Sequence, residues 1–144
     1  MSDKNLNAYL KYKPDVSNCP PDLFFASKRN DLVLKKLIKN GLRPYVQAKK
    51  GIGKYVIFQL MEKDMKDETI VLLLDNIKKE NIQLINEPDS DKYILHKAVE
   101  SGHLKTVAKL LDLGADPDIT NNKGVNASKL AANQPEILKL LNER

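Results

Sequence analysis

The two histidines of the chain, His96 and His103, are the first side chains whose type and spacing could do chemistry. They are seven residues apart, and such a pair could act as general acid and base or share a metal ion. No third ligand follows at metal-binding spacing, which weakens the case for either role. The pattern therefore favours structural roles for both histidines, and the sequence predicts no bound metal.

A lysine-rich segment between Ala48 and Tyr55 has part of the pattern of a phosphate-binding loop. Such a loop needs glycine in place of Ala48 and serine or threonine in place of Tyr55, so phosphate chemistry is rejected. The glycines of the segment instead predict a turn at the tip of a hairpin. That tip would present four side chains to solvent, Lys49, Lys50, Lys54 and Tyr55.

The remaining reactive groups do not suggest an enzyme. Asp64, Asp67 and Glu68 could do acid–base work if their pKa values were separated, but lysines alternate with them as in a solvated turn. Cys19, the single cysteine, stands in a loop-like stretch without a neighbouring base, which predicts an inert thiol. A lone cysteine cannot form an internal disulfide, so we expect a reducing compartment, the cytoplasm or the nucleus. We predict no catalytic residue and no cofactor.

The elements that would position these groups are most regular between Asp91 and Pro117. Apolar residues recur there at helical spacing in two short runs. Gly102 follows the first run and Gly114 the second, where a left-handed residue without a Cβ can end a helix. Pro117 then pushes the residue before it into an extended conformation. The segment therefore predicts a helix, a turn, a second helix and an extended exit.

The motifs Leu95-His96-x-Ala98, Gly102-His103 and Gly114-Ala115-Asp116 occur in the order and spacing that resemble an ankyrin repeat. The resemblance implies that His96 ties a helix start to neighbouring backbone by hydrogen bonds, and that His103 lies at the turn between two helices. A repeat of this kind cannot bury its apolar face alone, so further copies are expected in the chain.

Weaker copies follow the same register. Leu23, Ile57, Leu95 and Ser128 occupy matching positions, at steps of 34, 38 and 33 residues. We read the long step as extra residues between Asn76 and Gln83 that lengthen a second helix or a loop. The predicted units are 22–53, 54–90, 91–123 and 124–144. Residues 1–21 precede them and either cap the array or form a partner-binding tail.

The resulting fold prediction is all-α, an ankyrin-repeat solenoid of about four helix–turn–helix units with short β-hairpin-like loops. An ordinary helical bundle is the alternative for the same helices. The Gly-Ala-Asp-Pro exit argues against it, because it leaves an extended segment long enough for a projecting hairpin.

Charge is distributed unevenly along the 144 residues, whose net charge is +5. Residues 1–60 carry 12 lysines and arginines against 4 acidic residues, and residues 61–144 carry 12 against 15. This predicts a protein partner with an acidic surface patch. Nucleic acid is the rival interpretation, but only three of the cations are arginines, on which phosphate and base recognition depends most. No apolar run approaches the roughly 18 residues of a membrane helix, so no membrane contact is expected.

The resemblance implies a protein–protein interaction module, monomeric in isolation, whose partner lies in the concave groove made by hairpin tips and first helices. That surface would include Lys49, Lys50, Lys54, Tyr55, Lys92, Tyr93, Asn121, Asn122 and Lys123. Tyr93 could anchor the partner or replace the threonine usual at this helix start. The alternative function is an inhibitor or immunity-type protein that occludes an enzyme.

Overall fold

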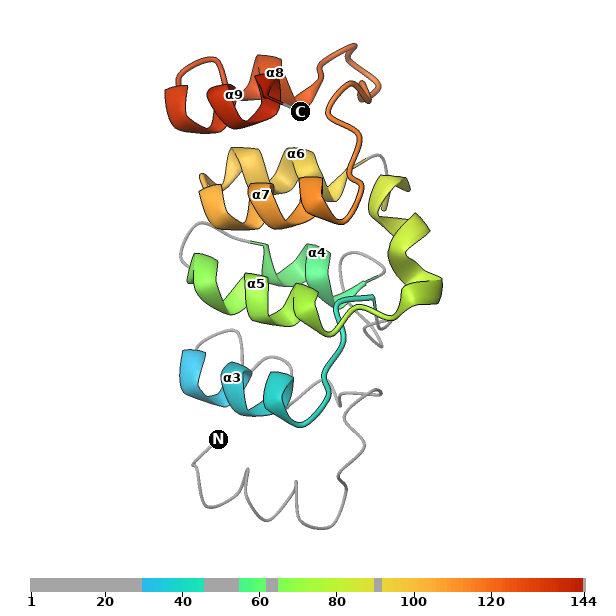
Figure 1. Ribbon diagram of the computed structural model, residues 1–144, viewed down its shortest axis with the longest axis vertical. Coiled ribbons are helices and arrows are strands. Elements are labelled where there is room, and N and C mark those ends of the chain that lie inside the picture. The colour runs from blue at the N-terminus through green and yellow to red at the C-terminus, as the bar shows by residue number, and fades with distance from the viewer. Residues whose placement is uncertain (1–29, 46–54, 62–64, 90–91, 144) are drawn as a thin grey trace.

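The computed structural model describes residues 30–45, 55–61, 65–89 and 92–143, which form a stack of short helices (Figure 1). The helices are α3 Asp31–Lys39, α4 Val56–Leu60, α5 Asp67–Asp75, the 3₁₀ helix η1 Lys79–Asn86, α6 Ile94–Glu100, α7 Leu104–Asp112, α8 Ala127–Leu130 and α9 Pro135–Asn142. The predicted segment 1–21 and the expected first helix of the first unit lie outside the described residues.

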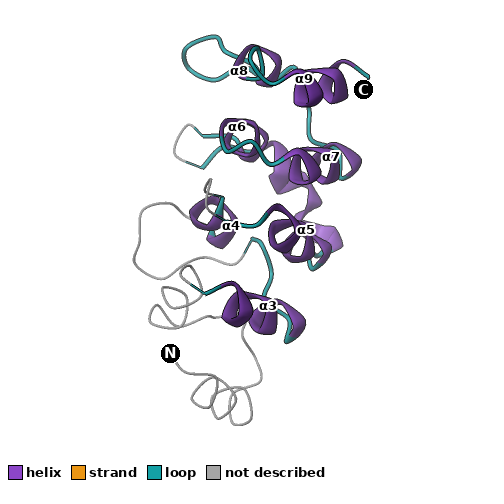
Figure 2. Ribbon diagram, turned by 90° about the vertical axis from the view of Figure 1, so that its left-hand side faces the viewer, coloured by secondary structure: helices purple, strands orange, loops and turns teal. Residues whose placement is uncertain are grey.

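The helices are arranged in two columns. Figure 2 shows α3, α5, α7 and α9 in one column and α4, α6 and α8 in the other. Each pair of consecutive helices, α4 with α5, α6 with α7 and α8 with α9, forms one layer, and each layer packs on the next (Figure 1). This arrangement confirms the predicted all-α solenoid and is not that of a helical bundle.

The third unit follows the sequence prediction closely. Gly102 has a φ of 72° after α6, and Gly114 has a φ of 102° after α7. These are left-handed conformations that L side chains adopt only with strain. The N–H of each glycine donates to the carbonyl three residues earlier, that of Val99 and that of Leu111, so each glycine closes its helix as the motif requires.

The extra residues of the second unit form a separate element. The prediction of a lengthened second helix or loop across Asn76–Gln83 was wrong, because α5 ends at Asp75 and the 3₁₀ helix η1 follows. Asn86, at the end of η1, bonds through both the nitrogen and the oxygen of its side-chain amide to the segment that follows α7. Its Nδ2 donates to the carbonyl of Gly114 at 2.9 Å, and its Oδ1 accepts from the N–H of Asp116 at 2.7 Å.

Carboxylates join consecutive units. Asp67 accepts hydrogen bonds from the N–H of Lys105 at 2.8 Å and from the N–H and hydroxyl of Thr106 at 2.8 and 2.6 Å. Asp31 accepts from the hydroxyl of Thr69 at 2.6 Å in the same way. The prediction that Asp67 and Glu68 lie in a solvated turn was therefore wrong, since they begin α5.

The carboxyl of Asp31 shows the electrostatic effect of this arrangement. Partial burial works to raise its pKa, but the hydrogen bond from Thr69 and the ammonium of Lys35 outweigh burial and hold the pKa below its ordinary value. The ammonium groups of Lys35 and Lys66 lie 3.2 and 3.8 Å from its Oδ2. The carboxylate of Asp31 therefore stays charged to a lower pH than that of an ordinary aspartate.

The apolar core lies between the two columns and continues through every layer. Its largest fully buried side chains are Leu34, Leu37, Leu42, Ile57, Leu60, Met61, Ile70, Leu73, Leu74 and Ile85. Because no unit could bury this surface by itself, each helix pair depends on its neighbours.

Candidate partner-binding surface

An isolated antiparallel bridge between Asp89 and Lys92 precedes α6, with N–O distances of 2.8 and 3.1 Å. The Oδ2 of Asp89 also accepts from the N–H of Tyr55 at 3.2 Å, which ties this bridge to the start of α4. The bridge leaves the side chain of Lys92 exposed, directly before Tyr93, the N-cap of α6.

His96 fixes the loop that follows α7. Its Nε2 lies 3.0 Å from the carbonyl oxygen of Ile119, and since a carbonyl can only accept, this nitrogen carries the proton. His96 and His103 are each 5% exposed, and His103 is the N-cap residue of α7. The structural positions predicted for the two histidines are thereby confirmed.

The loop anchored by His96 is shaped by Asn121. Its Oδ1 accepts from the N–H groups of Lys123 at 2.9 Å and Val125 at 3.1 Å. Its own N–H donates to the carbonyl of Val125 at 3.0 Å, and its carbonyl accepts from the N–H of Gly124 at 2.9 Å. These four bonds close a compact turn and hold Asn122 and Lys123 at its exposed tip.

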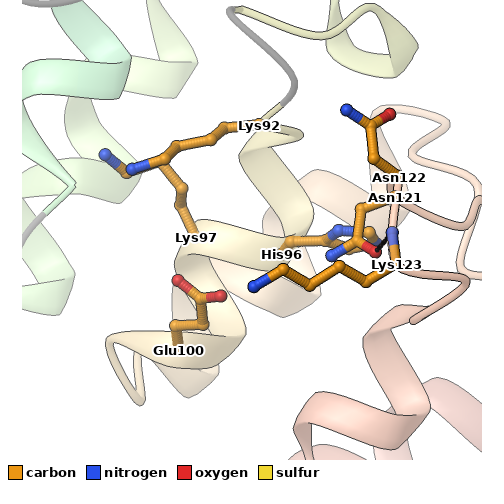
Figure 3. Close-up of a pocket in the computed structure, with 7 residues that line it drawn as sticks. All are labelled: Lys92, His96, Lys97, Glu100, Asn121, Asn122 and Lys123. Carbon is orange, nitrogen blue, oxygen red and sulfur yellow. Dashed lines mark hydrogen bonds between the residues drawn. The ribbon is translucent and has the colours of Figure 1, made fainter.

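Helix α6, Lys92 before it and this loop line a cavity of about 270 Å³ that is partly open to solvent (Figure 3). Four residues predicted for the partner-binding surface meet there, although they lie up to 31 positions apart in the sequence. They are Lys92, Asn121, Asn122 and Lys123. The wall contributed by α6 consists of His96, Lys97 and Glu100.

The cavity is electropositive. Three lysines, Lys92, Lys97 and Lys123, line it against one glutamate, Glu100, and Figure 3 shows the ends of Lys92 and Lys97 turned away from Lys123. Within the described part of the chain, Lys92 and Lys123 form no ion pair, whereas Lys105 pairs with Glu68 at 2.8 Å on the opposite column. Such a concentration of one charge in a concavity attracts anions.

A family model described as "Ankyrin repeats (3 copies)" matches residues 23–121, more than half of the chain. The chain belongs to the ankyrin-repeat family. It is similar to human ankyrin repeat domain-containing protein 29, with 46% identity over 50 residues. The match covers 35% of this chain and 16% of that protein's own length. Ankyrin repeats are generally protein–protein interaction modules and are typically non-enzymatic.

The structure describes two of the other residues expected on the ankyrin-repeat surface, Tyr55 and Tyr93, and neither lines this cavity. Lys49, Lys50 and Lys54 lie outside the described residues. Tyr93 is half-buried, and its ring centroid lies 5.4 Å from that of His96 in an edge-to-face contact. Its side chain makes no capping hydrogen bond. In this ankyrin unit a packed aromatic ring therefore stands where a threonine would usually cap the helix.

Lys97 and Glu100 were not predicted as surface residues. Both lie on α6, three positions apart and thus on one helical face. The sequence signal that could have identified them is their spacing of four and seven positions from Tyr93, the N-cap residue of α6.

Among the residues that the structure describes, no group of three histidine, cysteine, aspartate or glutamate side chains could hold a metal ion. No helix within the same residues is long and apolar enough to cross a membrane.

Tyr55 occupies a different place from the one expected at an exposed tip. It is half-buried at the N-cap of α4, and its ring meets that of Tyr45 edge to face, with centroids 5.2 Å apart. Tyr45 is 7% exposed, and its hydroxyl makes no hydrogen bond in the described structure. Burial, followed by the charge of Tyr55, raises the pKa of Tyr45 well above its ordinary value of 10.0.

Replacing Tyr45 with phenylalanine is expected to increase the free energy of unfolding by about 1 kcal/mol at pH 7, because it removes a buried hydroxyl without a partner. The unfolded chain ionises Tyr45 near pH 10 while the folded chain resists ionisation. The native protein should therefore lose stability as the pH rises above 10, and the variant should lose less. Urea unfolding at pH 7, 9 and 11 measures both effects, with Tyr93→Phe as the control. A destabilised Tyr45→Phe variant would contradict the assignment.

Proposed function

We propose that the chain binds a protein partner along the column of first helices, α4, α6 and α8, and that the partner contributes an acidic surface. The observation that carries this proposal is that Lys92 and Lys123, which are 31 positions apart in the chain and form no ion pair within the described residues, line one cavity. A cationic cavity steers an acidic partner towards it and disfavours basic ones.

The distribution of charge along the array supports the same proposal. The strongly basic first 60 residues would extend the cationic surface towards the first two units, where the tip residues Lys49, Lys50 and Lys54 are expected. The chain would act as an adaptor or as a subunit of a complex, monomeric alone, in the cytoplasm or the nucleus. An inhibitor that occludes an enzyme would use the same surface and would differ in leaving its captured partner inactive.

The test compares two variants with the same change in charge. Lys92→Glu/Lys123→Glu reverses the charge of two lysines that line the cavity. Lys39→Glu/Lys139→Glu reverses the charge of two exposed lysines in the second-helix column. Affinity capture from the source cell, with the bound proteins identified by mass spectrometry, is expected to lose its specific partner only with the cavity variant. Equal capture by both variants would overturn the proposal.

The same capture experiment addresses the rival partners. A partner that remains bound after nuclease treatment is a protein rather than a nucleic acid. Assaying any captured enzyme in the complex then separates an adaptor from an inhibitor, because only an inhibitor leaves the enzyme without activity.

A further inference from the structure

The joint between the third and fourth units is built differently from the two joints before it. Asp31 and Asp67 are the first residues of α3 and α5, and each accepts a hydrogen bond from a threonine of the next helix in the same column. Leu104, the first residue of α7, holds the matching position next to α9. An aliphatic side chain accepts no hydrogen bond, so the fourth unit, α8 with α9, docks without a carboxylate at this position.

The apolar contact of the fourth unit is also small. Among the described residues, the third unit buries six apolar side chains larger than alanine, whereas the fourth unit buries two, Ile137 and Leu141. Gln134, the N-cap residue of α9, adds one hydrogen bond from its Nε2 to the carbonyl of Val99 at 2.9 Å. Because hydrophobic stabilisation is proportional to the apolar area buried, the fourth unit is held less strongly than the third.

The loop that lines the cavity is continuous with the fourth unit. The N–H of Asn121 donates to the carbonyl of Val125, and the N–H of Val125 donates back to the Oδ1 of Asn121. The next residue, Asn126, is already the N-cap of α8. The bond from His96 holds the loop to the third unit at Ile119, two positions before this turn. The turn of residues 121–125 is therefore tied directly to α8, and the cavity lies between it and α6.

We infer that the fourth unit detaches from the third before the rest of the array unfolds, and that the cavity exists only while the fourth unit is docked. This inference rests on the proposed function and adds the regulation of its site. Local opening costs least free energy where few apolar side chains are buried. When only the docked form can bind, the apparent affinity falls in proportion to the docked fraction. A bound partner in turn stabilises the docked form by mass action.

Urea titration of the ¹⁵N-labelled full chain, followed residue by residue in ¹H–¹⁵N NMR spectra, tests the order of unfolding. The native signals of α8, α9 and residues 121–125 are expected to disappear together, at a midpoint roughly 0.5 M or more below that of α5 and α7. A single transition shared by all helices would overturn the inference. It would also be overturned if residues 121–125 kept their native signals after α9 had lost its own, because the loop would then belong to the third unit.

Two substitutions in α9 separate docking from direct contact with the partner. Ile137 is 4% exposed and Lys139 is exposed, and neither lines the cavity. Ile137→Ala is expected to lower the first midpoint by a further 0.5 M, roughly, or to leave α8 and α9 unfolded in water, while α5 and α7 keep their native signals. The control Lys139→Ala should leave both midpoints nearly unchanged. An unchanged first midpoint in Ile137→Ala would contradict the role of burial at this joint.

The same two variants test the link between docking and binding. In affinity capture from the source cell, Ile137→Ala is expected to retain the partner roughly fivefold less than Lys139→Ala, although both changes lie outside the cavity. Equal capture by the two variants would show that docking does not control the cavity, and the inference would fail.

The outcomes keep this inference apart from the proposed function. If the fourth unit unfolds together with the rest of the array, the inference is overturned, while the proposed function stands as long as capture depends on Lys92 and Lys123. Loss of that dependence overturns the proposed function itself, and with it the regulation inferred for its site.

Discussion

Replacing Leu110 with alanine is expected to lower the free energy of unfolding by about 2–5 kcal/mol. The side chain of Leu110 is completely buried, and its helix, α7, packs against α5, α6 and α9. The substitution removes buried apolar surface from a helix that contacts three others and leaves a cavity that the neighbouring layers can fill only in part. In a solenoid such a loss acts on both adjacent interfaces, because each unit contacts only its neighbours.

The control is the same substitution at an exposed leucine. Leu72, on α5, is 44% exposed, so Leu72→Ala should change the free energy of unfolding by less than about 1 kcal/mol. Urea unfolding followed by far-ultraviolet circular dichroism measures both variants. Similar losses at the two positions would show that burial in this structure does not determine the stability of the array.

The sequence predicted the third unit well because its signals are local. Gly102 and Gly114 end helices through backbone conformation alone. His96 contacts a loop of its own unit, 23 residues later in the chain. The same register also placed Lys92 and Lys123 on one surface. One repeat length separates such residues in the chain, but stacking brings them together in space.

Features that depend on contacts between units could not be predicted in this way. The alternation of acids and lysines around Asp67 has the same pattern in a solvated turn and at a helix start. Only the position of Thr106, 39 residues later, decides between them. Likewise η1 is held by Asn86 against the exit of the next unit, and nothing within residues 76–83 encodes that partner.

The pairing of Tyr45 with Tyr55 is a further case of this kind. The two residues precede and follow the segment 46–54 in the sequence, and their rings meet edge to face. Sequence reasoning treated Tyr55 as part of the exposed tip because lysines and glycines surround it. The aromatic contact keeps Tyr55 half-buried, although the residues around it in the sequence are typical of an exposed segment.

Replacing Asp67 with alanine is expected to lower the free energy of unfolding by about 2–4 kcal/mol, since it leaves several donors without an acceptor. These donors are the N–H groups of Lys105 and Thr106 and the hydroxyl of Thr106, and Thr106 is completely buried. The first N–H groups of a helix have no partner within the helix, so Asp67 caps α7 from the preceding unit.

The matched control is Asp75→Ala at the other end of α5. Asp75 forms an ion pair with Lys109 at 2.6 Å between the same two helices, but it is half exposed. Exposed pairs contribute about 0–1 kcal/mol, so this loss should be much smaller than that of Asp67→Ala. Thermal and urea unfolding of the two variants measure the difference, and equal losses would mean that Asp67 acts only as a surface charge.

A double-mutant cycle with Thr106→Val establishes whether the interaction itself causes the loss. If Asp67 and Thr106 stabilise the chain through their mutual hydrogen bonds, the double variant should lose less stability than the sum of the two single variants. Residues in direct contact usually show coupling of about 0.5–3 kcal/mol. Simple additivity would place the effect of Asp67 in its contacts with the backbone N–H groups of Lys105 and Thr106, because Thr106→Val removes only the hydroxyl. In either case the contact between α5 and α7 joins the second unit to the third. Helix α7 in turn packs against α6, which lines the cavity.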